Sequence, residues 1–316
     1  MATSPSIVIR AFNEEKHIGK LLAGIAEQTL DDPEIIVVDS GSTDATVAIA
    51  SRFGVRVVHV EPEEFTFGRS LNLGCQAATR QHIVIASAHV FPVYPDWLER
   101  LVAPFEDPAV ALSYGKQRGG PETKFSEHQI FAKLYPDQSQ ARQHSPVCNN
   151  ANAAIRRQLW RQHPYDESLS GLEDLAWAQW ALAQGHYLAY VAEAEVIHIH
   201  EESARQVYNR YQREAIALRR IRPQESFYLV DLPRLYLSNV ASDLYHAKRE
   251  GRLGETWRRI LWFRWMQFWG TYRGFVHRGP LDQRLKETFY YPRAIRRPAT
   301  ASTRKMEPID YGHLQE

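Results

Sequence analysis

The feature of the sequence that most constrains its fold is the alternation of short apolar runs with amphipathic stretches over the first 86 residues. The apolar runs predict strands, and the stretches with apolar residues three or four positions apart predict helices. The expected strands cover residues 7–9, 35–38, 55–60 and 82–86, and the expected helices cover 13–28, 43–53 and 68–79. Strands joined by helices in this way form a parallel sheet with helices on both faces, and ligands bind at the carboxyl ends of its strands.

The distribution of charge divides the chain into two parts. The 316 residues carry a formal net charge of +1, but residues 205–316 have a net charge of +11 and residues 1–204 one of −10. From about residue 205 the alternation also gives way to helical stretches rich in Arg, Tyr and Trp. We therefore predict an α/β domain over residues 1–204 and a helical, basic extension over residues 205–316.

Composition narrows the class of protein. A content of 44% apolar residues is ordinary for a globular protein and excludes a disordered chain. The near-zero net charge, with no recognised binding motif, argues against a nucleic-acid partner. The two cysteines, Cys75 and Cys148, are most simply free thiols in a reducing compartment. Because no stretch resembles a signal peptide and no apolar run reaches about 18 residues, we predict a cytoplasmic location.

Polar residues follow the first two expected strands. Asn13 comes soon after the first, and Asp39 ends the second and leads into a Ser-Gly-Ser-Thr-Asp segment. A carboxylate at a strand end beside a helix N-terminus can accept a hydrogen bond from a nucleotide base or a ribose hydroxyl. Capping of the next helix explains Thr43 and Asp44 equally well. The local pattern therefore fits both nucleotide binding and helix capping.

These segments resemble the opening motifs of the family 2 glycosyltransferases, which have the GT-A fold, and the similarity continues to about residue 203. The matching segments are RAFNEE (10–15), VDSGSTD (38–44), FGRSLNLG (67–74), PDWL (95–98), YGKQ (114–117), CNNANAAIR (148–156), GLEDLAW (171–177) and VIHIH (196–200). Each is weak alone, but their order and spacing are specific. Within the family, the chain is most similar to bacterial rhamnosyltransferase-like enzymes of surface-polysaccharide assembly. The resemblance implies a donor that is a nucleoside-diphosphate sugar of the UDP, GDP or dTDP type.

The resemblance also assigns roles to individual residues. Asp39 is expected to contact the nucleotide base. The other residues expected in the nucleotide-sugar site are Ala11, Asn13, Arg69, Asn72, Ser87 and Asn150. For Asn150, which is expected to bind sugar hydroxyls, turn and cap chemistry is the alternative.

Glu173 and Asp174 match the acidic motif of the family. In that motif the second carboxylate removes the proton of the acceptor hydroxyl as it attacks the anomeric carbon. The resemblance thus makes Asp174 the general base and Glu173 a supporting catalytic residue. The alternative is that both carboxylates only stabilise the N-terminus of a helix, which we expect over residues 175–184.

The match fails at the metal site. The family usually has an Asp-x-Asp motif after the fourth strand, where this chain has Ser87, Ala88 and His89. His198 and His200 are two residues apart on an expected strand, so they point to the same face. The resemblance allows the three histidines to bind one divalent metal (Mn or Mg), or to hold the diphosphate in a metal-independent enzyme. The alternative is that His198 and His200 are ordinary strand residues.

Two further stretches carry expectations of their own. A helix is expected to begin near Ala153, after the polar segment at residues 148–152. Between Lys116 and Lys133, the sequence Gly-Gly-Pro at residues 119–121 predicts a mobile loop that closes over donor or acceptor.

In the basic extension, four of the eight tryptophans lie between residues 257 and 269, among several arginines. At helical spacing, one face should carry Trp257, Leu261, Trp265, Phe268 and Tyr272. A helix over residues 255–276 that combines Trp with Arg is typical of one that lies on an anionic membrane. The alternative is packing against the catalytic domain or against a second copy in a homodimer, because aromatic stripes usually belong to a core.

We therefore predict an inverting glycosyltransferase that transfers a hexosyl or deoxyhexosyl group to a glycan or a lipid-linked glycan. A lipid-linked acceptor would place the enzyme at the inner face of the membrane. The main alternative is a catalytically inactive protein that keeps the fold and binds a sugar nucleotide. A nucleotidyltransferase is a third alternative, but the chain lacks the Gly-rich, basic loop that it would need after the first strand.

Overall fold

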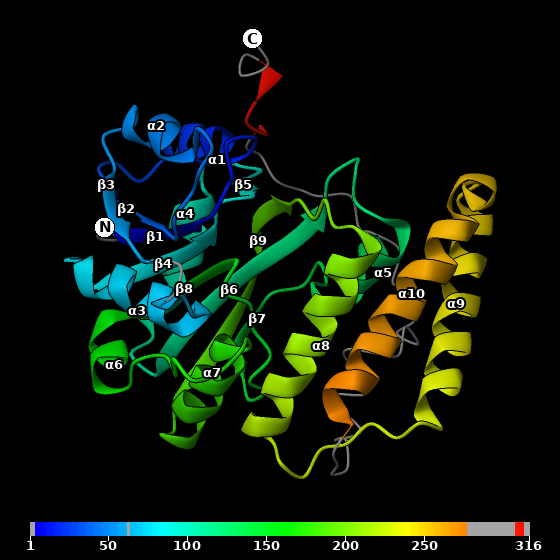
Figure 1. Cartoon of the computed structure of the whole chain (residues 1–316). Helices are drawn as coiled ribbons and strands as arrows, with labels where there is room; N and C mark the ends of the chain where they lie inside the picture. The colour runs from blue at the N-terminus through cyan, green and yellow to red at the C-terminus, as the bar shows by residue number, and fades with distance from the viewer. Residues whose placement is uncertain (1–3, 62–63, 277–306, 313–316) are drawn as a thin grey trace.

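Strands and helices alternate in the first part of the chain, and helices follow residue 203 (Figure 1). The structure is a computed structural model that describes residues 4–61, 64–276 and 307–312. In chain order, the elements are β1 (Ser6–Ala11), α1 (Ile18–Ala26), β2 (Glu34–Asp39), α2 (Thr46–Ser51), β3 (Arg56–His59), α3 (Phe67–Ala77), β4 (His82–Ser87), β5 (Val90–Pro92), α4 (Trp97–Val102), a 3-10 helix (Ala103–Glu106), β6 (Val110–Gly119), α5 (Phe125–Leu134), β7 (Gln140–Gln143), β8 (Asn152–Arg156), α6 (Arg157–Gln162), α7 (Glu173–Ala183), β9 (Tyr187–His198), α8 (Ala204–Ile221), α9 (Asp231–Arg249) and α10 (Leu253–Phe275).

The strands form one sheet with the order β3-β2-β1-β4-β8-β6-β9-β5, and β7 pairs with β9. β1 is parallel to β2 and β4, and β2 is parallel to β3, as the alternation predicts. At the carboxyl end of β1, Ala11 lies beside Asp39 and Arg10 beside Ser87. The predicted α/β fold with a mostly parallel sheet is therefore confirmed, and the predicted polar residues meet at one end of it.

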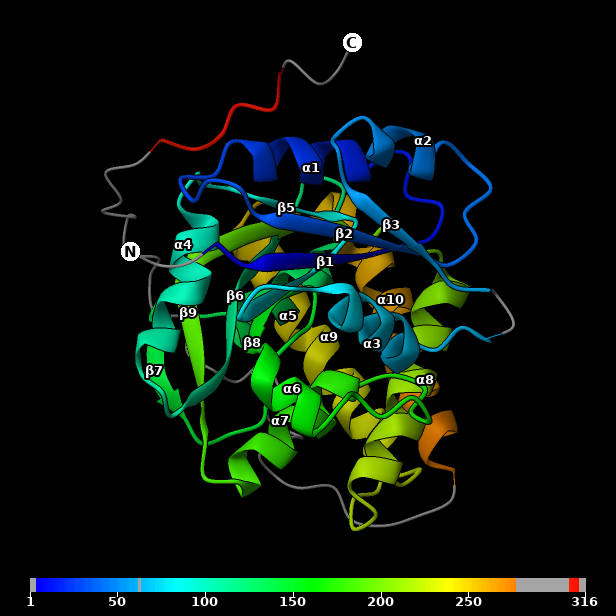
Figure 2. The ribbon, with the colours of Figure 1, turned by 90° about the vertical axis from the view of Figure 1, so that its left-hand side faces the viewer.

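Alternate residues of β1 face opposite sides of the sheet, as the pleat of a strand requires. Ile7 and Ile9 belong to the apolar cluster that includes α1 and α4, whereas Val8 belongs to the cluster that includes α3, α6 and α7. Figure 2 shows α1 and α3 on these two opposite sides of the sheet. Because both faces are covered, a ligand can reach the strands only at their ends.

One local prediction is wrong, and one predicted loop covers few residues. Residues 152–156 form strand β8 instead of a helix near Ala153, and β8 runs antiparallel between β4 and β6. Its alanines have a high helix propensity, but their small side chains fit the fully buried centre of the sheet. This packing outweighs the propensity and makes the segment a strand. The loop expected at the Gly-Gly-Pro segment covers only residues 120–124, because β6 continues to Gly119 and α5 begins at Phe125, and its mobility stays a prediction.

The basic extension consists of α8, α9 and α10 in the part of the chain that the structure describes, with α10 between the other two (Figure 1). α8 begins with a capping box, in which Ser203 and Gln206 exchange hydrogen bonds. One apolar cluster joins all three helices to Leu175 of α7, and a second joins α9 and α10 to α5. The extension thus shares a core with the α/β part, while a domain boundary at residue 204 stays a prediction.

The aromatic residues of α10 do not form the single face that was expected. Phe268 is fully buried, whereas Trp257 and Trp265 are 42% and 41% exposed. The inward side also carries Arg264, whose guanidinium forms two hydrogen bonds to the buried Asp243 carboxylate, at 2.8 and 2.9 Å. α10 therefore packs within the protein on one side and presents tryptophan on another. Among the described residues, no helix has the length and apolar character needed to cross a membrane.

The last described residues, 307–312, return to the α/β part of the molecule near α1 (Figures 1 and 2). The N–H of Ile309 donates to the carbonyl of Val93 at 3.0 Å, and the hydroxyl of Tyr311 donates to the carbonyl of Pro92. Gly24 of α1 leaves the space for Tyr311, because a Cβ at that position would lie 2.4 Å from the tyrosine hydroxyl. The C-terminal residues thus support β5, the last strand in the sheet order.

Candidate active site

Three histidines meet at one end of the sheet. His89 follows β4, His198 ends β9, and His200 comes two residues later, and one ring nitrogen from each lies within 4.8 Å of the others. The ring centroids of His198 and His200 are 4.1 Å apart, and those of His89 and His198 are 5.1 Å apart. The antiparallel pairing of β5 with β9 causes this meeting, because it places Val90 opposite His198. The structure thus brings together the three histidines that the sequence singled out.

Each of these histidines uses its Nδ1 atom within the protein. The Nδ1 contacts are His89 to the Glu14 carboxylate at 2.7 Å, His198 to the Gln117 side-chain oxygen at 2.6 Å, and His200 to the Glu127 carboxylate at 2.7 Å. An oxygen that accepts from Nδ1–H leaves the lone pair of Nε2 for a ligand. The Nε2 atom of His198 is buried and has no hydrogen-bond partner among the described residues. The cluster therefore offers imidazole nitrogens that the fold has oriented.

Burial favours the neutral form of two of these rings. Burial, followed by the neighbouring His200 and His89, lowers the pKa of His198 well below its usual value. Burial also lowers the pKa of His200, although Glu127 opposes the effect. Neutral imidazole is the form that binds a metal ion, and it suits Mn²⁺ better than Mg²⁺. The residues present therefore fit a divalent metal of the Mn²⁺ kind.

Glu127 of α5 lies behind His200 and is 1% exposed. Its carboxylate also accepts a hydrogen bond from Arg210 of α8 at 2.7 Å, and Arg210 bonds Glu202 at 2.6 Å. Burial opposes the charge of Glu127, but His200 and Arg210 outweigh burial and hold its pKa at about 2. Glu127, His200 and Glu202 are also close enough to hold a metal. Because Arg210 already forms ion pairs with both carboxylates, we assign them to the layer that orients His200.

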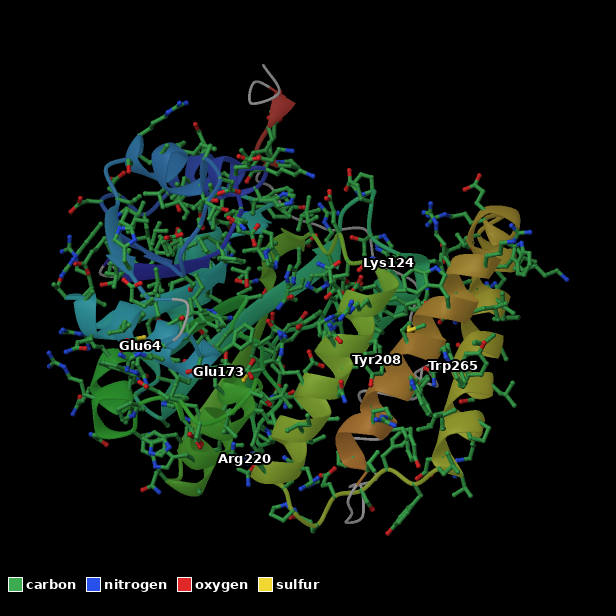
Figure 3. The ribbon with its side chains drawn as sticks, viewed as in Figure 1. Glu64, Lys124, Glu173, Tyr208, Arg220 and Trp265 are labelled. Carbon is green, nitrogen blue, oxygen red and sulfur yellow. The ribbon has the colours of Figure 1, made fainter. Side chains whose placement is uncertain are left out.

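Glu173 and Asp174 lie in the first turn of α7. Figure 3 shows Glu173 on the side of α7 that faces α8. The helix begins two residues earlier than predicted, because Leu172 adopts a left-handed φ of 57° and turns the chain there. Asp174 is 8% exposed and accepts hydrogen bonds from the N–H groups of Asn150 and Leu175, at 3.1 and 2.8 Å. Burial, followed by repulsion from Glu173, raises the pKa of Asp174 to about 7.

The raised pKa of Asp174 helps to compare the two alternatives for the acidic pair, catalysis and stabilisation of the helix N-terminus. A carboxylate that only stabilises a helix N-terminus is favoured in its charged form, so its pKa should fall. The pKa of Asp174 rises instead, because burial and the like charge of Glu173 outweigh the two N–H groups. A buried carboxylate that titrates near neutral pH is typical of proton-transfer chemistry, so this pKa is consistent with the catalytic role of Asp174, which stays a prediction.

Asn150 lies beside Asp174, and Ser87 is the last residue of β4. Both side-chain atoms of Asn150 that can hydrogen-bond are buried, and neither has a partner among the described residues. The N–H of Ser87, at the end of β4, donates to the carbonyl of Ala151 at 3.4 Å. The unused amide of Asn150, next to Asp174, is consistent with the predicted contact to a sugar hydroxyl, which stays a prediction.

Ala11, Asn13 and Asp39 lie together where β1 and β2 end. The buried Asp39 carboxylate accepts hydrogen bonds from the N–H groups of residues 41 and 42 at 3.2 Å. Asn13, with a φ of 54°, accepts from the N–H of Thr43 at 2.8 Å. These bonds hold the loop over residues 40–44 in place. The side chains of Asp39 and Asn13 therefore both stabilise this loop. The contact of Asp39 with a nucleotide base stays a prediction.

Arg69 and Asn72 of α3 are tied to the segment that follows α6. Arg69 forms ion pairs with Glu64 at 2.6 Å and Glu167 at 3.5 Å. The amide of Asn72 donates to Glu167 at 2.9 Å and accepts from the N–H of Tyr165 at 3.0 Å. These contacts give Asn72 a structural role in joining two segments, and a role of either residue at the nucleotide stays a prediction.

Sequence reasoning missed several residues that belong to this region. Arg10 of β1 pairs with Glu173, with 3.6 Å between Nη1 and Oε1. Arg10 and Arg213 of α8 both lie over the ring of Phe67, at 4.9 and 4.4 Å from its centroid. Arg10 and Phe67 stand inside motifs that match the family, which is a signal that points to them. Arg213 lies in the extension, where no local pattern distinguishes it from the other arginines.

A model of the family described as glycosyl transferase family 2 matches residues 6–163 of the chain. The chain belongs to this family. Two similar relatives of this family 2 glycosyltransferase are O-antigen chain rhamnosyltransferases from Salmonella. RfbN of Salmonella typhimurium is 26% identical over 220 residues, which cover 65% of this chain and 69% of the relative. WbaN of Salmonella anatum is 28% identical over 204 residues, which cover 58% of this chain and 62% of the relative.

A solved structure extends the comparison to the fold. The mannosyltransferase PcManGT from Pyrobaculum calidifontis, in complex with GDP-Man and Mn²⁺, has a TM-score of 0.57 and 19% sequence identity. The similarity covers 85% of this chain and 86% of that one. At this identity the likeness shows the fold alone. The expected GT-A fold is confirmed, and the family match confirms that the chain is a transferase enzyme.

Proposed function

We propose that this glycosyltransferase moves a sugar from a nucleoside-diphosphate sugar to an acceptor hydroxyl with inversion, and that Asp174 is the general base. The observation that carries the proposal is the buried Asp174 carboxylate, whose pKa is raised to about 7 by burial and by Glu173. A base with a pKa near the operating pH is ionised in part and still has enough proton affinity to take the hydroxyl proton.

In the proposed reaction, the acceptor oxygen attacks the anomeric carbon of the donor sugar as its proton moves to Asp174. The bond between that carbon and the diphosphate oxygen breaks, and the nucleoside diphosphate leaves with the bonding electrons. A single displacement from the face opposite the leaving group inverts the anomeric carbon. The N–H groups of Asn150 and Leu175 hold the Asp174 carboxylate in one orientation for this transfer.

His89, His198 and His200 would hold a divalent metal, with Mn²⁺ favoured over Mg²⁺. When bound, such an ion supplies positive charge to the departing diphosphate. The protein itself contributes the fixed orientation of the three rings, through a hydrogen bond to each Nδ1. The complex of the mannosyltransferase with GDP-Man and Mn²⁺ supports both this donor class and this metal.

The names of the relatives support a surface polysaccharide as the product, because both are O-antigen chain rhamnosyltransferases. We propose a glycan or lipid-linked glycan acceptor and a deoxyhexosyl donor on this basis. The exposed Trp257 and Trp265 of α10 suit contact with an anionic membrane or with a second copy of the chain. Flotation with anionic liposomes and measurement of the molar mass in solution separate these two alternatives.

The substitution Asp174→Asn tests the proposed function. It keeps the size of the side chain and an oxygen acceptor, but it removes the proton acceptor. We expect transfer from a panel of UDP, GDP, dTDP and CDP sugars to fall by at least about a hundredfold, the lower end of the contribution of a general base. Binding of the matching nucleoside diphosphate should stay unchanged, as should activity in the control Asp31→Asn, an exposed residue. Full transfer activity in Asp174→Asn would contradict the proposal.

A further inference from the structure

We propose that Arg10 and Arg213, together with the ring of Phe67, form a binding site for a phosphoryl group beside the catalytic pair. This proposal rests on the glycosyl transfer proposed above. The phosphoryl group belongs either to the donor diphosphate or to a phosphate on the acceptor, because both have the same chemistry toward a guanidinium group. No motif of the sequence assigns such a site.

The geometry of the site comes from three elements. β1 supplies Arg10, α3 supplies Phe67, and α8 supplies Arg213. The guanidinium carbons lie 4.9 and 4.4 Å from the centre of the Phe67 ring, within the range of a cation–π contact. The ring thus orders two long side chains that would otherwise be mobile. Both arginines and Phe67 are partly exposed, so a ligand can reach them from solvent.

The charges at this place are incompletely matched. The Nε atoms of Arg10 and Arg213 are buried and have no hydrogen-bond partner among the described residues. The contact of Arg10 with Glu173 is an ion pair at 3.6 Å, which is too long for a hydrogen bond. Burial lowers the pKa of Arg213, Glu214 and Glu173 oppose this effect, and Arg210 and Arg10 add to it. Two cations are therefore held close together with donor groups that remain unused.

A phosphoryl group supplies the hydrogen-bond acceptors that these donor groups lack. Its oxygens can accept two parallel N–H hydrogen bonds from each guanidinium group. A single carboxylate such as Glu173 has too few oxygens to do this for both arginines. The position next to Asp174 places such a group within the reaction region. In addition, α8 carries Arg213, so the basic extension contributes directly to the ligand site of the α/β part.

The test is calorimetric titration of the full chain with inorganic pyrophosphate in the presence of a chelator, which removes any contribution of a metal at the histidines. We expect Arg213→Gln to weaken binding about ten- to a hundredfold, the effect of losing charge-assisted hydrogen bonds. Arg213→Lys should recover only part of the affinity, because it keeps the charge and loses the fork. Arg10→Gln is a second variant of the same site. Arg205→Gln, an exposed position of α8, is the matched control and should bind normally.

Each outcome decides one point. If wild type does not bind pyrophosphate, or if Arg213→Gln and Arg10→Gln bind it within about twofold of wild type, the site is refuted. If binding weakens in these variants and nucleoside diphosphates displace pyrophosphate, the donor is the source of the phosphoryl group. If binding weakens and both bind together, the acceptor is the source. Pyrophosphate binding should survive in Asp174→Asn, so failure of the proposed base and failure of this site are distinguishable.

Discussion

The protonation of Asp174 should control the rate of transfer between pH 6 and pH 8. With a pKa of about 7, the ionised fraction of Asp174 is about one tenth at pH 6 and about nine tenths at pH 8. Because only the ionised carboxylate accepts the hydroxyl proton, kcat/KM should rise about tenfold over this range and then level off.

The substitution Glu173→Gln makes this prediction specific. Burial is the largest cause that raises the pKa of Asp174, and the charge of Glu173 is the second largest. Removing that charge should move the midpoint of the pH profile to lower pH and raise the relative activity at pH 6. A residue that only supported the fold would lower the rate at every pH by a similar factor and leave the midpoint in place.

The same pKa shift predicts the pH dependence of stability. Asp174 keeps its proton in the folded state above pH 3.8, where the unfolded chain releases it. Its contribution to stability is therefore fully present below about pH 4 and is lost as the pH rises through about 7. At about 1.4 kcal/mol per pKa unit, the loss is at most about 4 kcal/mol. Asp174→Asn removes this loss, so the variant should be more stable than wild type at pH 8.

The assay combines initial rates between pH 5.5 and 8.5 at constant ionic strength with urea unfolding at the two ends of the range. A variant Asp174→Asn that is folded, more stable at pH 8 and inactive would separate loss of catalysis from loss of structure. A flat rate profile in wild type, or an unchanged midpoint in Glu173→Gln, would refute the reasoning about Asp174.

Three further predictions concern other parts of the molecule. Mn²⁺ at a hundredfold excess over its Kd should stabilise wild type by about 2.7 kcal/mol, and the increase in Tm should largely disappear in His89→Ala; an equal increase in both would contradict the histidine site. Asp243→Ala leaves the buried Arg264 without its carboxylate and should cost about 3–5 kcal/mol in urea unfolding, with a smaller loss in Asp243→Asn. Gly24→Ala should displace residues 307–312, because its Cβ would lie 2.4 Å from the hydroxyl of Tyr311. The amide hydrogen of residue 309 should then exchange at least about tenfold faster, and an unchanged exchange rate would contradict this.

The elements that could be predicted are those whose signal is local. The apolar runs of β1, β2 and β4 are short and continuous because these strands are buried on both faces, and such runs are visible in the sequence. The segment 152–156 was misassigned because its alanines suit a helix locally, while the space between β4 and β6 requires a strand. On α10, spacing alone grouped Phe268 with the exposed tryptophans, and the helices packed on either side separated them.

The sequence by itself determined the parallel part of the sheet, the acidic pair at residues 173–174 and the three histidines, because each depends on residue type and on spacing within a short segment. Tertiary structure decided what surrounds them. Glu127 is 73 residues from His200, and Arg210 is 83 residues from Glu127, yet hydrogen bonds join them in one network. The approach of Arg213 to Arg10 over the Phe67 ring arises only when α8 packs on the α/β part, and the pKa of Asp174 rises because the folded chain buries it beside Glu173. Burial and the approach of distant charges have no signature along the chain, and they set the chemistry of this site.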